Sequence, residues 1–153
     1  MTPQIFTISV MLARVCVSEA GWDAHDECAV IVHALNQQAI QRNVSLKRQI
    51  CDYAPKSCDQ ERTRRRWIAF LEPDRRTAPP GWPRLPWEPY RAKFAGMVVT
   101  AWETMTGRRA SPCPEAFHWG SRHCPACERR MRRRFERIEC VGMKNVWYRR
   151  RGT

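Results

Sequence analysis

One carboxylate in this chain stands where it could act as a general acid. Glu19 lies at the end of a predicted helix, just before Gly21 and beside Trp22. A glutamate that an aromatic wall partly withdraws from water can stay protonated near neutral pH. A general acid that donates its proton to a glycosidic oxygen must be protonated at the pH at which it works. The alternative interpretation is an ordinary solvent-exposed glutamate at a helix end.

A second group of residues has the chemistry of a metal site or of disulfides. Cys113, His118, His123, Cys124 and Cys127 lie within fifteen residues, and Cys124 and Cys127 have the C-x₂-C spacing of a zinc-binding turn. Because a second C-x₂-C is missing, disulfides among these cysteines and Cys140 fit the same residues. Disulfides are favoured, and a structural zinc and free thiols are the alternatives. Acid catalysis by a carboxyl group requires no cofactor.

The elements that would position Glu19 follow from apolar spacing. Apolar residues recur at helical intervals over 7–18 and again over 24–41, with Gly21 between the two runs. We therefore expect a helical hairpin over residues 1–42 that carries Glu19 near its elbow. The first residues lack a basic start and a small-residue cleavage site, so we interpret them as a core helix and not as a signal peptide.

Capping residues and prolines mark the remaining elements. Asp23 is expected to cap the second helix, with Asp26 at the capping-box position. Prolines make residues 72–89 a loop, because proline lacks a backbone donor and disfavours helix in the residue before it. Further helices are predicted over residues 45–53, 61–71, 94–105 and 128–137.

The charge of the chain is strongly positive and concentrated near its end. The 153 residues, one domain in length, hold 27 Lys and Arg against 15 Asp and Glu. Residues 121–153 alone have eleven basic and three acidic side chains, within an irregular basic segment over 108–153. Such a chain attracts polyanions. No stretch approaches the about 20 apolar residues of a membrane span.

Several short blocks of the sequence stand in an order that is typical of one enzyme family. The first block is Leu12-Ala13-Arg14-Val15 with Ser18-Glu19-Ala20, followed one helix later by Ala34-Leu35-Asn36. Two later blocks contain aromatic residues: Ala116-Phe117-His118-Trp119-Gly120 and Gly142-Met143-Lys144-Asn145-Val146-Trp147-Tyr148. In order and in approximate spacing, from residue 12 to residue 148, these blocks resemble the SleB-like cell-wall hydrolases, in particular a phage-type member, and the later two resemble the aromatic segments that close the family's domain.

The resemblance implies a fold and a reaction. The fold would be mainly α, a single compact lysozyme-like helical domain over 1–153 with a long irregular, cysteine-rich C-terminal segment. Glu19 would protonate the glycosidic oxygen between N-acetylmuramic acid and N-acetylglucosamine, and then act as base. A lytic transglycosylase is favoured over a hydrolase, because attack by the sugar's own 6-hydroxyl needs no second carboxylate.

The same resemblance implies partners and substrate contacts. The partners would be peptidoglycan glycan strands, and other virion or tail proteins if the enzyme acts on the cell wall as a virion component. Candidate substrate contacts are Trp22, His118, Trp119, Asn145 and Tyr148, although each aromatic residue could equally belong to the core. A function of a different class is the alternative: a zinc-stabilised nucleic-acid-binding module built on the basic, Cys/His-rich C-terminal segment.

Overall fold

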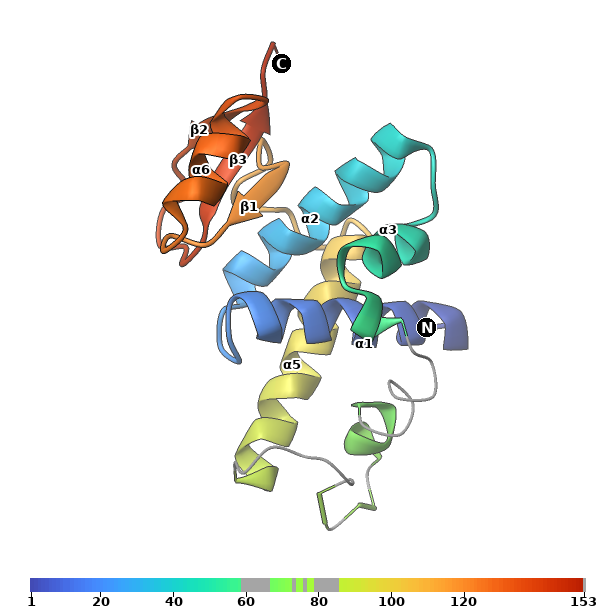
Figure 1. Cartoon of the computed structure of the whole chain (residues 1–153). Helices are drawn as coiled ribbons and strands as arrows, with labels where there is room; N and C mark the ends of the chain where they lie inside the picture. The colour runs from blue at the N-terminus through green and yellow to red at the C-terminus, as the bar shows by residue number, and fades with distance from the viewer. Residues whose placement is uncertain (59–66, 73, 76, 79–85, 153) are drawn as a thin grey trace.

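The computed structural model describes residues 1–58, 67–72, 74–75, 77–78 and 86–152. The protein is mainly helical, as predicted, with a small sheet formed by its C-terminal part (Figure 1). The elements described are α1 (Pro3–Glu19), α2 (His25–Arg42), α3 (Leu46–Tyr53), η1 (Pro55–Ser57), η3 (Ala69–Leu71), α5 (Trp87–Met105), β1 (His118–Gly120), α6 (Pro125–Arg132), β2 (Phe135–Ile138) and β3 (Val146–Arg150).

The predicted helical hairpin is present. The Thr2 hydroxyl caps α1 by accepting a 3.3 Å hydrogen bond from the Ile5 N–H. The helix ends before Gly21, whose φ of 106° lies in the left-handed region that glycine adopts without a steric penalty. Residues 10–13 of α1 are buried in the core, which agrees with the interpretation of this segment as a core helix.

The predicted cap of α2 is wrong. Ala24 occupies the N-cap position and makes no side-chain hydrogen bond there. Asp23 instead pairs with Lys93 of α5 at 2.7 Å, and Asp26 pairs with Arg109 at 2.8 Å. Both carboxylates therefore bind basic groups from distant parts of the chain and do not form a capping box.

The core is built where α5 packs against α1 and α2. In Figure 1, α5 crosses α1 steeply. Phe94, Met97 and Ala101 of α5 are fully buried against residues of the hairpin. This helix begins at Trp87, so the proline-rich loop predicted over 72–89 ends earlier than expected. The prediction of a helix over 61–71 falls largely on residues 61–66, which lie outside the described residues, as does half of that loop.

The C-terminal segment is more regular than predicted. Its strands form an antiparallel sheet of order β1-β3-β2, in which Trp119 lies opposite Trp147 and Glu136 opposite Arg149. The helix expected over 128–137 starts earlier, as α6, and β2 takes the later residues. The strands are only three to five residues long. Strands this short contain too few residues for an alternation of apolar and polar side chains to stand out in the sequence.

All eight cysteines are paired in disulfides. One bridge, Cys16–Cys28, joins α1 to α2 inside the core, and Cys51–Cys58 closes a short loop after α3. The favoured prediction for the later cysteines is confirmed, as Cys113–Cys140 and Cys124–Cys127. Among the described residues, no helix is both long and apolar enough to cross a membrane.

Candidate functional site

Glu19 is the last residue of α1, and two aromatic side chains from other elements hold its carboxylate. The indole Nε1–H of Trp119, in β1, donates a 3.2 Å hydrogen bond to Glu19 Oε2. The side chain of Tyr53, at the end of α3, lies beside this carboxylate and interacts with it electrostatically. Burial and the negative charge of Glu19 raise the pKa of Tyr53 well above its usual value. Tyr53 therefore keeps its proton and stays a donor.

The aromatic rings beside Glu19 form one group of rings that contact each other at tilted angles. The Tyr53 and Trp119 rings lie 4.8 Å apart, and the Trp119 and Trp147 rings 5.5 Å apart. Trp147 is only 1% exposed, whereas Tyr53 is 40% exposed. The buried ring fixes Trp119 from behind, and the exposed ring presents an apolar face to solvent next to the carboxylate.

A groove opens beside Glu19. It has a volume of about 380 Å³ and runs between the C-terminal half of α1 and the α3–η1 connection, lined by Arg14, Val15, Ser18, Glu19, Ala54, Pro55 and Lys56. Arg14 reaches across by donating to the Lys56 carbonyl. Among the described residues that line this groove, Glu19 is the one acidic side chain. The groove thus combines a single carboxylate with two basic residues.

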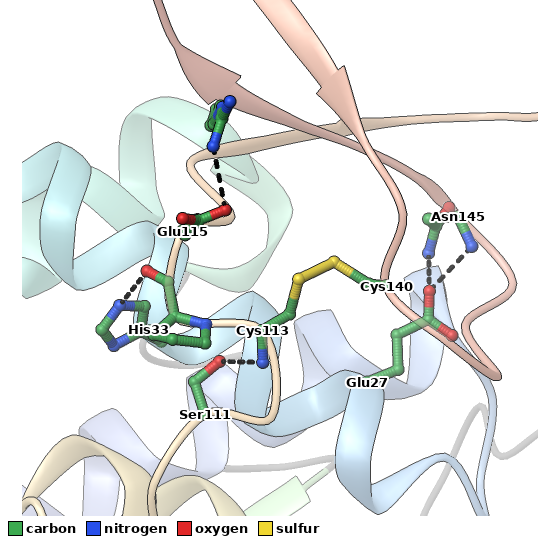
Figure 2. Close-up of a disulfide and its surroundings, with 9 residues drawn as sticks. Glu27, His33, Ser111, Cys113, Glu115, Cys140 and Asn145 are labelled. Atoms are coloured by element: carbon green, nitrogen blue, oxygen red, sulfur yellow. Dashed lines mark hydrogen bonds and ion pairs between the residues drawn. A yellow bond between two sulfur atoms is a disulfide. The ribbon is translucent and has the colours of Figure 1, made fainter. Parts of the chain in front are cut away.

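The backbone of Glu19 is held by a second contact. Asn145 donates from Nδ2 to the Glu19 carbonyl oxygen at 3.2 Å. The same amide donates to Glu27 Oε1 at 2.8 Å (Figure 2). Asn145, a predicted substrate contact, has hydrogen bonds that join α1, α2 and the residues that precede β3. Carbonyls in the last turn of a helix lack partners within the helix, and Asn145 supplies one.

His118 and Tyr148 lie in the sheet but turn away from Glu19. Because side chains alternate along a strand, His118 projects from the face opposite that of Trp119. Its Nδ1 accepts a hydrogen bond of 3.2 Å from Gln38, and its ring contacts Phe135 at 4.5 Å. Burial, followed by the charge of Arg134, lowers the pKa of His118. Tyr148 is 1% exposed, so its side chain packs within the protein.

Trp22 belongs to a different aromatic cluster. Its ring packs edge-on against Tyr90 at 4.9 Å and lies 6.3 Å from both Trp67 and Phe94. These partners connect the elbow of the hairpin to α5. Of the residues predicted to contact substrate, the structure brings Trp119 and Asn145 to Glu19 and places Trp22, His118 and Tyr148 in other contacts.

The disulfides remove the basis of the predicted zinc site. A structural zinc needs thiolate ligands, but the sulfurs of Cys113, Cys124 and Cys127 are bonded to other sulfurs. His123 is exposed. In the part of the chain that the structure describes, no three His, Cys, Asp or Glu side chains gather as metal ligands. The Cys124 sulfur serves a different purpose, since it accepts the Cys127 N–H at 3.2 Å and caps α6.

Trp147 and Tyr148, the aromatic residues next to the arginines of β3, do not lie on the basic surface of the C-terminal segment. Trp147 and Tyr148 are buried, so neither offers a ring to a nucleic-acid base. On α6 and the turn after it, the side chains of Arg129, Arg130, Arg133 and Arg134 are exposed and form no ion pair with any described residue. This surface therefore presents guanidinium groups, and Trp147 and Tyr148 do not add rings on which nucleic-acid bases could stack.

Two residues of the site were not predicted. Tyr53 ends the helix predicted over 45–53, and Glu27 lies in the first turn of α2, where the structure leaves it 3% exposed. The signal in the sequence is that Glu27 directly precedes the apolar run from Cys28 to Val32. A carboxylate on the buried face of a helix requires donors nearby. Nothing in the local sequence of Tyr53 indicates its contact with Glu19.

Comparisons with known proteins give no match to this chain: no protein-family model, curated protein or solved structure is similar to it.

Proposed function

We propose that this protein cleaves the glycan strands of peptidoglycan between N-acetylmuramic acid and N-acetylglucosamine, with Glu19 as acid and base. The observation that carries the proposal is the placement of the Glu19 carboxylate, held by the Trp119 indole at the side of an open groove. The resemblance of the segments around Glu19, Trp119 and Trp147 to SleB-like hydrolases supports the same reaction, with a lysozyme-like domain as its setting.

The groove suits an anionic glycan strand. Muramic acid residues carry carboxyl-bearing substituents, and Arg14 and Lys56 give the groove positive charge. The exposed face of Tyr53 next to Trp119 offers the flat apolar surface on which pyranose rings pack. These features favour a polysaccharide over a small neutral sugar as the ligand.

The proposed reaction uses one carboxyl group twice. Protonated Glu19 donates its proton to the glycosidic oxygen, and the bond from that oxygen to the anomeric carbon of muramic acid breaks. The Glu19 carboxylate then takes the proton of the muramic acid 6-hydroxyl as that oxygen attacks the anomeric carbon. A 1,6-anhydro end forms. Glu19 is the one acidic side chain among the described residues that line the groove, and this favours the transglycosylase outcome, because an inverting hydrolase needs a second carboxylate to activate water.

The docking role of the basic surface belongs to the same proposal. Peptidoglycan and the polymers attached to it are anionic, and the exposed arginines of α6 and of the turn after it, which form no ion pair with a described residue, would hold the enzyme near them. Delivery to the wall as a virion component is consistent with this role.

The test is release of muropeptides from purified sacculi by the wild-type protein and by Glu19→Gln. Glu88→Gln serves as a matched control, since Glu88 is an exposed residue in the first turn of α5. We expect products with 1,6-anhydro-muramic ends, identified by mass spectrometry, from wild type and Glu88→Gln only. Products with reducing ends would show that the enzyme is a hydrolase and not a transglycosylase. Failure of the wild-type protein to release any product would overturn the proposal.

A further inference from the structure

We infer that Glu27 and Asn145 are positioning residues that set the place of Glu19 from behind the groove. The catalytic consequence of this inference rests on the proposed function, whereas the contact itself can be tested independently. Glu27 lies in the first turn of α2, and Asn145 directly precedes β3. Neither residue lines the groove beside Glu19.

The Glu27 carboxylate is bound by three N–H groups from one short segment. Its Oε2 accepts the Lys144 backbone N–H at 2.8 Å. Its Oε1 accepts both the backbone N–H and the side-chain amide of Asn145, each at 2.8 Å. Figure 2 shows Asn145 poised above this carboxylate. A carboxylate that is 3% exposed is stable only with such donors, so the segment and α2 are fixed to each other.

From this anchor the contact continues to Glu19. The second hydrogen of the Asn145 amide is donated to the Glu19 carbonyl oxygen at 3.2 Å. One amide group therefore joins the buried carboxylate of Glu27 to the backbone of the proposed acid. A change in the position of the Asn145 side chain would move the end of α1 and the carboxyl group that it carries.

Residues of the C-terminal sheet, or directly beside it, bind both the backbone and the side chain of Glu19. Trp119, which binds the carboxylate, pairs in register with Trp147, two residues after Asn145. The Cys113–Cys140 disulfide ties the chain before β1 to the chain before Lys144. Backbone and side chain of Glu19 thus receive their contacts from one covalently closed unit. Glu27 holds this unit at the Lys144–Asn145 segment, and His33 and Gln38 of the same helix hold it near β1.

The chemistry of the contact predicts which substitutions break it. Glu27→Gln replaces one acceptor oxygen by an NH₂ group, so a donor would face a backbone N–H of residues 144–145. Asn145→Ala keeps both backbone bonds to Glu27 but removes the link to Glu19. This variant therefore leaves the anchor intact and tests the positioning step alone. Asp26→Asn is the matched control, since it removes a carboxylate from the same turn of α2 that is 73% exposed.

The experiment has one spectroscopic and one kinetic readout. The spectroscopic readout is the Trp119 indole N–H signal in a ¹H–¹⁵N spectrum of the full chain, assigned with Trp119→Phe. The kinetic readout is kcat and KM on solubilised glycan strands. We expect Asn145→Ala and Glu27→Gln to shift the indole signal and to lower kcat about tenfold with KM within about twofold. Asp26→Asn should match the wild type in both.

Two results would overturn the inference. One is an unshifted indole signal in both variants. The other is a loss of kcat that merely parallels a loss of folded protein on thermal unfolding. If the wild-type protein releases no muropeptides, the proposed function fails, and the indole signal alone decides whether Glu27 and Asn145 position Glu19.

Discussion

The indole of Trp119 donates a 3.2 Å hydrogen bond to the carboxylate of Glu19, across one hundred residues of sequence. This bond joins the end of α1 to the first strand of the C-terminal sheet. It fixes the direction in which the carboxylate points without closing the groove beside it. A side chain preorganised in this way loses little freedom when substrate binds.

Trp119→Phe should lower activity more than stability. The substitution removes the donor to Glu19 but keeps a ring between Tyr53 and Trp147. A hydrogen bond to a charged group contributes about 1.5–3 kcal/mol, so we expect kcat for muropeptide release to fall by about ten- to a hundredfold. The midpoint of thermal unfolding should change by only a few degrees. Full activity of Trp119→Phe would contradict a role for this bond.

His118 should make the protein less stable below neutral pH. Its pKa is lowered by burial and by Arg134, so the folded protein binds its proton less readily than the unfolded chain does. As the pH falls through the ordinary histidine value of 6.5, the unfolded state gains protons first, and the free energy of unfolding decreases.

The measurement is the free energy of unfolding in urea between pH 7.5 and about pH 5. His118→Phe keeps an aromatic ring against Phe135 and removes the titrating group. Its unfolding free energy should vary less steeply with pH than that of the wild type, whatever its absolute value. Equal slopes would show that His118 does not contribute to the acid loss of stability.

Whether a feature of this protein could be predicted depended on how far apart in the sequence its interacting residues lie. The α1–α2 hairpin and α5 follow from apolar residues at helical spacing, which is a local signal. The sheet does not, because its short strands pair over long separations and carry arginine at several positions.

The site divides in the same way. Glu19 could be selected because a helix end and an aromatic neighbour are visible in sequence. Its actual neighbours could not, since Trp119 and Asn145 reach it from 100 and 126 residues away. The N-cap predicted at Asp23 failed for a related reason: an ion pair with Lys93, 70 residues away, took the carboxylate.

The two C-terminal disulfides should differ in what they contribute to stability. Cys113 and Cys140 are 27 residues apart, whereas Cys124 and Cys127 are 3 apart. From chain entropy, closing the longer loop should contribute about 3.5 kcal/mol to the free energy of unfolding and closing the shorter one about 2 kcal/mol. The longer bridge also ties the segment that binds Glu27 to the start of β1.

Paired serine variants measure this difference. Cys113→Ser with Cys140→Ser should lower the free energy of unfolding more than Cys124→Ser with Cys127→Ser, in matched urea titrations. The first pair should also broaden the Trp119 indole signal, and the second should leave it unchanged. A larger loss from the second pair would contradict the entropic account.

The exposed arginines of α6 and of the turn after it, which form no ion pair with a described residue, should govern attachment to the cell wall and not turnover. Changing Arg129, Arg130 and Arg133 together to Gln removes three positive charges, and the fraction of protein that sediments with sacculi at low salt should fall several-fold, about tenfold at most. The matched variant with Lys at the same positions keeps the charge and should retain attachment. Both should cleave soluble glycan strands at the wild-type rate, because these arginines do not line the groove at Glu19.

Attachment should weaken as salt is added, since exposed charges are screened over about 8 Å at physiological ionic strength. Tighter binding of the wild type to duplex DNA than to sacculi at equal salt would contradict this docking role and assign the basic surface to nucleic acid.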